Sequence, residues 1–231
     1  YLNTQNNHQM MIMTHVTTGT EADLLFQHWT VVRKPTLNRP YNITYRTGQG
    51  TIDAGGPTKQ FFTNISKQIQ DKYFRVLDEE TSRCVFKEGI TANEAEYIGQ
   101  LMAVFVKLNI PLPFAVSKLY IAHLMFRKED ISKEHMFLYY LLDVNKDAQR
   151  RMLDMCKASL TKRKEMSMVD EDYCNPENVY NDFIVPVYKY DTAIMDAFSK
   201  GFFIKKNIFY SRFYNINDKI RLYDMDKILS Q

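Results

Sequence analysis

The chain has 231 residues, 45% of them hydrophobic and 25% charged, with 8 glycines and 7 prolines. This composition excludes intrinsic disorder for most of the chain, and the length suits one large domain or two smaller lobes. The formal charge of +3 is small for a dedicated nucleic-acid-binding protein, and no apolar run approaches the roughly 20 residues of a membrane helix. We therefore expect neither nucleic acid nor a membrane as a partner.

The N-terminal part predicts a lead-in, a short helix and a strand. Residues 1–19 are polar and are expected to form an irregular lead-in. Capping and acidic residues from Thr20 to Asp23 indicate the start of a short helix. Tyr41, Ile43 and Tyr45 alternate with polar residues, which is typical of a half-buried strand.

A glycine-rich bend follows at residues 47–56 and leads into a helix that is expected to begin near Pro57. The bend matches neither the P-loop nor the dinucleotide-binding pattern, because the third glycine and the directly following lysine are missing. Its glycines are therefore expected to serve a tight turn. Phe62, Ile65 and Ile69 then recur at helical spacing.

The most apolar helix is predicted to begin at a capping box formed by Thr91 and Glu94. Its length and apolar character indicate a central, buried helix. Gly99 lies inside it at a cost of about 1 kcal/mol relative to alanine, so another element is expected to approach closely there. The segment 109–113, with prolines at 111 and 113, is expected to end the helix.

The remainder of the chain predicts further helices and one linker. The segment 161–177 is charged and is the best candidate for a linker. Gly201 is expected to form a left-handed cap at the end of the helix over residues 191–200. The helices are expected at about residues 114–127, 132–143, 147–160, 191–200 and 217–229. The fold class is therefore mainly α, with a few short strands.

No motif for catalysis, a cofactor or a metal is present. The histidines are dispersed, and the chain has neither a His-Glu-x-x-His nor a Gly-x-Ser-x-Gly pattern. Cys84, Cys156 and Cys174 are widely spaced and odd in number, which favours free thiols in a reducing compartment, cytoplasmic or nuclear. We expect no cofactor and no metal.

Three segments, in order along the chain, resemble the N-terminal lobe of HECT-type ubiquitin ligases. The first is residues 52–62, in which Asp-Ala-Gly-Gly leads into a helix with paired aromatics. The second is residues 97–120, with Tyr-Ile-Gly-Gln-Leu-Met and then Ile-Pro-Leu-Pro-Phe, and the third is residues 196–202, Asp-Ala-Phe-Ser-Lys-Gly-Phe. The residues that carry this signature are Asp53, Gly55, Gly56, Phe61, Phe62, Gly99, Pro111, Pro113, Phe198 and Gly201.

The resemblance implies a domain organisation. After the lead-in of residues 1–19, a helical large subdomain would comprise residues 20–142 and 183–231. Residues 143–182 would be a reduced form of the small subdomain, or a linker, where the family binds its ubiquitin-conjugating enzyme. The side chains predicted to contact that enzyme are Met152, Leu153, Met166, Met168 and Tyr173.

The resemblance also implies a function. An N-lobe of this kind holds a ubiquitin-loaded conjugating enzyme so that a cysteine on a C-terminal lobe can attack the thioester and pass ubiquitin to a protein substrate. None of the three cysteines has the family's Thr-Cys-Phe context, so this chain alone is not expected to form the thioester. The alternative is a non-catalytic scaffold or interaction module derived from the same lobe, and the sequence leaves both open.

Overall fold

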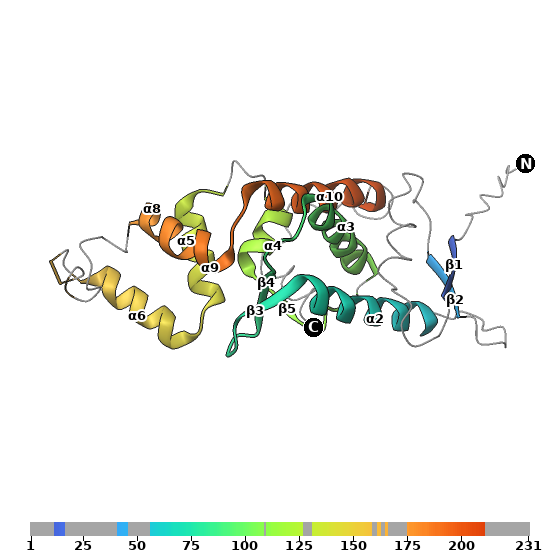
Figure 1. Ribbon diagram of the computed structural model, residues 1–231, viewed down its shortest axis with the longest axis horizontal. Coiled ribbons are helices and arrows are strands. Elements are labelled where there is room, and N and C mark those ends of the chain that lie inside the picture. Colours follow the sequence, from blue (N-terminus) through green and yellow to red (C-terminus); the bar gives the residue numbers. More distant parts are fainter. Residues whose placement is uncertain are drawn as a thin grey trace, which may run out of the picture. The chain divides into compact units, whose positions relative to one another are not determined.

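The computed structural model describes residues 12–16, 41–45, 56–108, 110–126, 131–158, 161–162, 165 and 175–210 (Figure 1). These residues are mostly helical, as predicted. The chain divides into two compact units, residues 1–68 and 69–231. The short helix expected after Thr20, the bend that contains Asp53 and Gly55, and the last predicted helix lie outside the described residues.

The first unit contains two short parallel strands. β1 (Ile12–Val16) pairs with β2 (Tyr41–Tyr45), with Ile12 opposite Tyr41 and Val16 opposite Tyr45. The strand predicted at residues 41–45 is therefore confirmed. The expectation of an irregular lead-in is wrong for residues 12–16, because these residues find a strand partner that lies far along the sequence.

Helix α2 (Gly56–Tyr73) begins beside Pro57, as predicted from the fixed backbone angle of proline at a first helical turn. Within the first unit, Phe62 and Ile65 are fully buried. Ser66 is also buried, and its hydroxyl donates a hydrogen bond to the Thr63 carbonyl oxygen at 2.8 Å. The side chain of Phe61 lies outside the described residues.

The second unit contains a three-stranded sheet that the sequence did not predict. β3 (Phe74–Asp78) and β4 (Arg83–Phe86) form an antiparallel hairpin, and β5 (Ala115–Val116) adds to β4 in parallel. These strands are two to five residues long, too short for a clear alternation of apolar and polar residues. Because residues 115–116 belong to β5, the helix expected over residues 114–127 begins only at residue 118.

Helices α3 (Ala92–Leu108) and α10 (Thr192–Tyr210) lie against each other and form the main helix pair of this unit (Figure 1). The predicted capping box of α3 is confirmed. The Thr91 N–H donates to Glu94 Oε2 at 3.0 Å, and the Glu94 N–H donates to Thr91 Oγ1 at 3.2 Å. α3 ends at Leu108, just before the segment that carries Pro111 and Pro113.

Two glycines allow the backbones of α3 and α10 to come this close. A Cβ atom on Gly99 would lie 2.0 Å from the Phe198 carbonyl oxygen, and one on Gly201 would lie 1.9 Å from the Glu96 carbonyl oxygen. The close approach predicted at Gly99 is therefore confirmed. The prediction that Gly201 ends its helix with a left-handed cap is wrong, because α10 continues to Tyr210 and Gly201 lies inside it.

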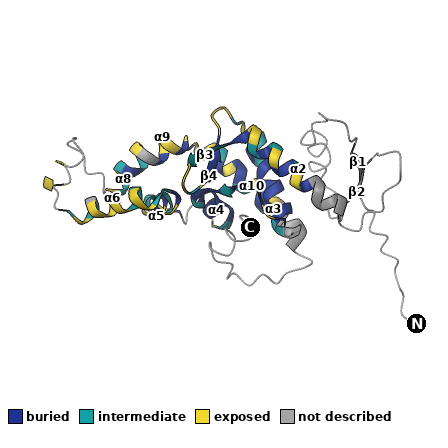
Figure 2. Cartoon of the chain, turned by 90° about the horizontal axis from the view of Figure 1, so that it is seen from below, coloured by how far each residue is buried: buried dark blue, intermediate teal, exposed yellow. Residues whose placement is uncertain are grey.

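An aromatic cluster fills the space between this helix pair, the sheet and α4 (Lys118–Met125). The Phe86 ring lies 5.2 Å from Phe198, edge to face, and 4.9 Å from Tyr120, and the Phe74 ring lies 5.0 Å from those of Phe86 and Phe114. Rings in these geometries contribute more than their buried area alone. Burial is accordingly concentrated on α3, α4 and α10 (Figure 2).

The second unit also contains a group of shorter helices, which we call the helical extension. It consists of α5 (Lys133–Asp143), α6 (Lys146–Lys157), α8 (Pro176–Val179), the π-helical turn η2 (Tyr180–Ile184) and α9 (Val185–Tyr188). The helices predicted over residues 132–143 and 147–160 correspond to α5 and α6. Pro176 and Glu177, expected to belong to a linker, already form the start of α8.

The π-helical turn has a local cause in Pro186. Proline has no N–H to donate to the carbonyl of residue 182, and its ring crowds that carbonyl. The helix accommodates this by widening, and the Val185 N–H bonds to the Tyr180 carbonyl five residues earlier.

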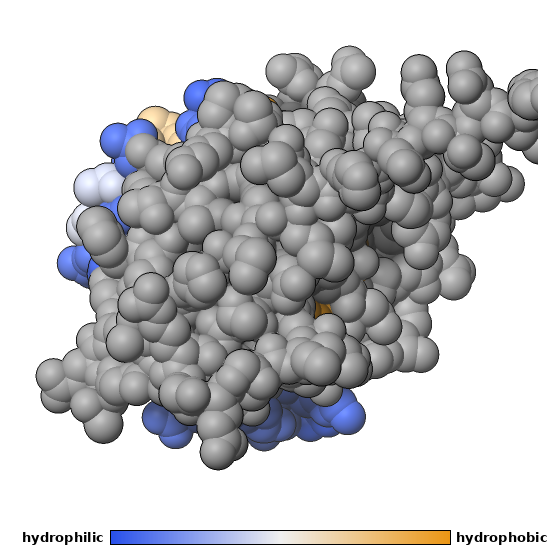
Figure 3. All heavy atoms as spheres, turned by 90° about the vertical axis from the view of Figure 1, so that its right-hand side faces the viewer, coloured by the Kyte–Doolittle hydropathy of each residue, from blue (hydrophilic) through white to orange (hydrophobic). Residues whose placement is uncertain are grey.

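Among the described helices, none is both long enough and apolar enough to cross a membrane. Most of the described residues visible on the face drawn in Figure 3 are hydrophilic.

Candidate functional site

A buried carboxylate joins the helical extension to the rest of the second unit. Asp143, the last residue of α5, has no exposed surface. Its Oδ2 accepts hydrogen bonds from the Ser117 hydroxyl at 2.5 Å and from the Tyr188 hydroxyl at 3.0 Å, and its Oδ1 accepts one from the Lys118 N–H at 2.7 Å. The Thr81 hydroxyl donates to the Asp143 carbonyl oxygen at 2.9 Å. One side chain therefore ties together the start of α4, the end of α5 and α9.

The environment of Asp143 explains its protonation behaviour. Burial raises the pKa of this carboxyl, and the hydrogen bonds from Ser117, Lys118 and Tyr188 oppose that shift. Burial also raises the pKa of the Tyr188 hydroxyl well above its ordinary value, and the neighbouring Asp143 carboxylate raises it further. Tyr188 is therefore a hydrogen-bond donor at all ordinary pH values, which suits an acceptor such as Asp143.

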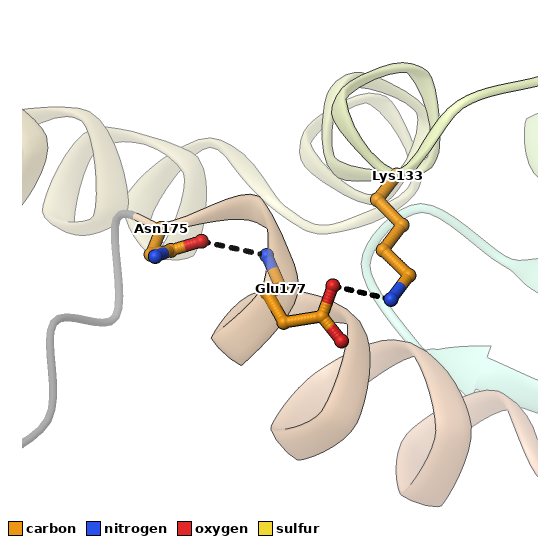
Figure 4. A network of polar contacts seen from close by, with 3 residues as sticks. All are labelled: Lys133, Asn175 and Glu177. Carbon is orange, nitrogen blue, oxygen red and sulfur yellow. Dashed lines mark hydrogen bonds and ion pairs between the residues drawn. The ribbon is translucent and has the colours of Figure 1, made fainter.

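A second set of contacts fixes α8 against α5 (Figure 4). The Asn175 side chain caps α8 by accepting a hydrogen bond from the Glu177 N–H at 2.9 Å. Lys133, at the start of α5, forms an ion pair with Glu177 and lies 4.9 Å from the centre of the Tyr180 ring. The ion pair is solvent-exposed and contributes little by itself. The cation–π contact adds to it, so Lys133 joins α5 to both α8 and η2.

The helical extension exposes apolar side chains that its packing leaves uncovered. On α5, Leu138 and Leu142 are 54% and 45% exposed and lie four residues apart, on one face of the helix. On α6, Leu153 is 39% exposed, whereas Met152 is buried and packs inward. Single exposed leucines are common on protein surfaces, but a pair on one helix face is a candidate contact surface for another protein.

The predicted contact residues are thus only partly placed by the structure. Leu153 is available at the surface and Met152 is not, while Met166, Met168 and Tyr173 lie outside the described residues. Their proposed role stays a prediction. Sequence reasoning missed Leu138, Leu142 and Asp143. A single carboxylate at the end of the apolar run Leu-Tyr-Tyr-Leu-Leu was the available signal for a buried, hydrogen-bonded acid.

A cleft of about 310 Å³ lies elsewhere in the second unit, between the loop after β4 and the start of α10. Its apolar wall includes Tyr120 and Met195, and an ion pair of 3.1 Å between Lys189 and Glu88 lies at its rim. None of its lining residues is a cysteine, serine, threonine or histidine. The cleft therefore has no hydroxyl or thiol nucleophile of the Ser–His or Cys–His kind.

The environment of Cys84 does not favour nucleophilic chemistry. Cys84 is a free, buried thiol on β4, and burial raises its pKa, which disfavours the reactive thiolate. Cys156 is half-buried on α6, and Cys174 lies outside the described residues. Within the part of the chain that the structure describes, no group of His, Cys, Asp and Glu side chains is placed to hold a metal ion.

The described residues of the HECT-like signature lie in different environments. Gly99, Phe198 and Gly201 meet at the crossing of α3 and α10, and Phe62 is buried on α2. Pro111 and Pro113 are exposed in the loop after α3, and the others lie outside the residues or side chains that are described. In comparisons with known proteins, no family model and no curated protein matched the chain.

Proposed function

We propose that this chain is a HECT-like N-lobe that positions a ubiquitin-loaded conjugating enzyme for transfer of ubiquitin to a protein substrate. The transfer would pass through a cysteine on a separate C-terminal lobe, because no cysteine of this chain has the context that the family requires. The contribution of the chain is then proximity: it brings a thioester and an attacking thiolate together, which makes their reaction effectively intramolecular.

One observation carries the proposal. The second and third segments that resemble the family are separated by 75 residues in the sequence, yet they share one core. Gly99 of the second segment lies against the backbone of Phe198 in the third, and the rings of Tyr120 and Phe198 are 6.1 Å apart. Residues that contact one another in this way support a shared structural signature better than separate local matches do.

The helical extension is the proposed contact surface for the conjugating enzyme. Leu138 and Leu142 provide an exposed apolar pair on α5, and Leu153 adds an exposed leucine on α6. The Asp143 junction holds α5 rigidly, because the carboxylate at its last residue bonds to two other helices. A rigid, mainly apolar contact of small area suits a transient partner that must bind, react and leave.

The experiment measures binding of this chain to a broad panel of ubiquitin-loaded conjugating enzymes by biolayer interferometry. We expect at least one enzyme to bind with a dissociation constant of about 10–100 μM, as is typical of transient contacts. Leu138→Glu and Leu142→Glu should each weaken that binding at least about tenfold, because a carboxylate would be desolvated in the contact.

The matched control is Ile204→Glu on α10, since Ile204 is also an exposed aliphatic residue, 39% exposed, and it lies outside the helical extension. This variant should bind as the wild type does. Lack of binding across the whole panel, or equal weakening by all three variants, would contradict the proposed contact. Incubation of the native full-length protein with activating enzyme, conjugating enzyme and ubiquitin then separates a ligase, which forms a reducible ubiquitin adduct, from the non-catalytic scaffold.

A further inference from the structure

Helix α6 exposes a row of four side chains, which we call the basic stripe: Lys146, Arg150, Leu153 and Lys157. Their spacings of four, three and four residues place them along one face of the helix, and all four are exposed. On the opposite side of the same helix Met152 is buried. The stripe therefore lies on the exposed side of an amphipathic helix, which also carries Asp147, Arg151 and Asp154.

Helix α6 carries part of the chain's charge surplus. It has four Lys or Arg side chains against two Asp, a surplus of two, while the full chain has a surplus of three. Arg150 forms a 3.5 Å ion pair with Asp147, but both side chains are more than 70% exposed. Such a pair is weak in water, so Arg150 remains available to a partner.

Leu153 interrupts the cations with an apolar side chain that is 39% exposed. It lies one turn from Arg150 and one turn from Lys157, so a bound chain would meet a leucine flanked by positive charges. We propose that the basic stripe binds an extended acidic segment of a partner protein, with an apolar side chain of that segment on Leu153 and its carboxylates on the flanking cations.

The dimensions of the stripe define the segment. Arg150 and Lys157, which flank Leu153, are seven residues apart, which corresponds to about 10 Å along a helix. An extended chain covers that distance in about four to five residues, and its alternate side chains face the same way. The proposed segment of the partner protein therefore has an acidic residue at each end, an apolar residue in the middle and any residue at the two positions between them.

A protein partner fits the stripe better than a nucleic acid does. Single-stranded nucleic acids gain much of their affinity from bases that stack on aromatic rings, and the stripe has no aromatic side chain. Phosphate contacts would also leave Leu153 without a role. Carboxylates placed on either side of an apolar side chain use Leu153 and a cation on each side of it.

The test is fluorescence anisotropy of the full 231-residue chain with the labelled peptide Gly-Ser-Asp-Ser-Leu-Ser-Glu-Ser-Gly. We expect a dissociation constant of about 100 μM at low salt, weakening at about 0.5 M salt because the charges are then screened. Leu153→Ser and Lys157→Glu should each weaken binding about five- to tenfold. Ile204→Ser and Lys67→Glu, which make the same changes at exposed positions elsewhere, should leave it unchanged.

Three results would overturn the inference. The first is no binding of the peptide, and the second is unchanged binding by the Leu153→Ser variant. The third is binding of a 15-nucleotide RNA or of phosphatidylserine vesicles that depends on Lys157 and not on Leu153, which would make the stripe a phosphate-binding surface. The assay contains no conjugating enzyme, so its failure would leave the proposed function standing, and failure of the enzyme panel would leave this inference standing.

Discussion

Gly201→Ala is expected to destabilise the second unit by about 3 kcal/mol or more, because overpacking at a rigid contact costs this much. The new Cβ would lie 1.9 Å from the Glu96 carbonyl oxygen and 2.7 Å from its carbon, and real Cβ atoms essentially never come within 3.0 Å of another heavy atom. α3 and α10 would have to separate by about 1 Å along their main interface. Alanine gains about 1 kcal/mol of helix propensity over glycine, which is too little to offset the clash.

Gly89→Ala is the matched control for this prediction. A Cβ on Gly89 meets no heavy atom within 4 Å, and only the positive φ of 81° opposes the substitution. The expected cost is about 1–2 kcal/mol. Thermal unfolding followed by circular dichroism should show a melting temperature about 10 °C below that of the wild type for Gly201→Ala. The decrease for Gly89→Ala should be clearly smaller. A Gly201→Ala protein as stable as the wild type would show that the helices do not cross this closely.

Asp143→Ala is expected to destabilise the second unit by about 3 kcal/mol, because three donors lose their shared acceptor in a buried site. The hydroxyls of Ser117 and Tyr188 and the Lys118 N–H all donate to this carboxylate. Asp143→Asn keeps the side-chain shape and one acceptor oxygen, so it should cost only about 1 kcal/mol. Urea unfolding of the three proteins at pH 7 measures both differences.

Asp191→Ala is the matched control for Asp143→Ala. Asp191 is an exposed cap of α10 that accepts hydrogen bonds from the N–H groups of Ala193 at 2.7 Å and Ile194 at 3.3 Å. Loss of such a cap costs about 1 kcal/mol. If Asp143→Ala costs no more than Asp191→Ala, the buried junction does not hold the helical extension in place.

Asp143 also gives the stability a pH dependence of known sign. Burial raises its pKa in the folded state above the ordinary value of 3.8, so the folded protein binds this proton more tightly than the unfolded chain does. Acidification from pH 7 towards pH 4 therefore stabilises the wild type relative to Asp143→Asn. The difference in unfolding free energy between the two should shift in favour of the wild type as the pH falls. A shift in the other direction would mean that hydrogen bonding outweighs burial at this carboxyl.

Local chemistry accounts for the elements that the sequence predicted correctly. The capping box of Thr91 and Glu94 satisfies N–H groups within one turn, and Pro57 suits the beginning of a helix whatever lies nearby. Gly99 in an apolar helix signalled a close approach because glycine there has a cost that packing must offset. Neither the partner of Gly99 nor the distance to it could be obtained from the sequence.

The features that the sequence predicted wrongly or missed depend instead on contacts between distant parts of the chain. Gly201 was expected to end its helix, but it lies inside α10, where the absence of a side chain leaves room for the backbone of α3. The candidate site shows the same limit. The basic residues of α6 were visible in the sequence, but the exposure of Leu153, the burial of Met152 and the leucine pair on α5 depend on packing.

The sequence by itself determined the helical class, most helix positions, the capping box at Thr91 and the helix start at Pro57, because these depend on hydrogen bonds and backbone angles within a few residues. Only the tertiary structure decided that Gly99 and Gly201 form one crossing and that β3, β4 and β5 form a sheet. It also decided that Asp143 joins three helices. Each of these features joins groups that are 25 or more residues apart in the sequence, or joins short strands to one another. The free energy of such contacts comes from burial and close approach, which no local pattern of residues encodes.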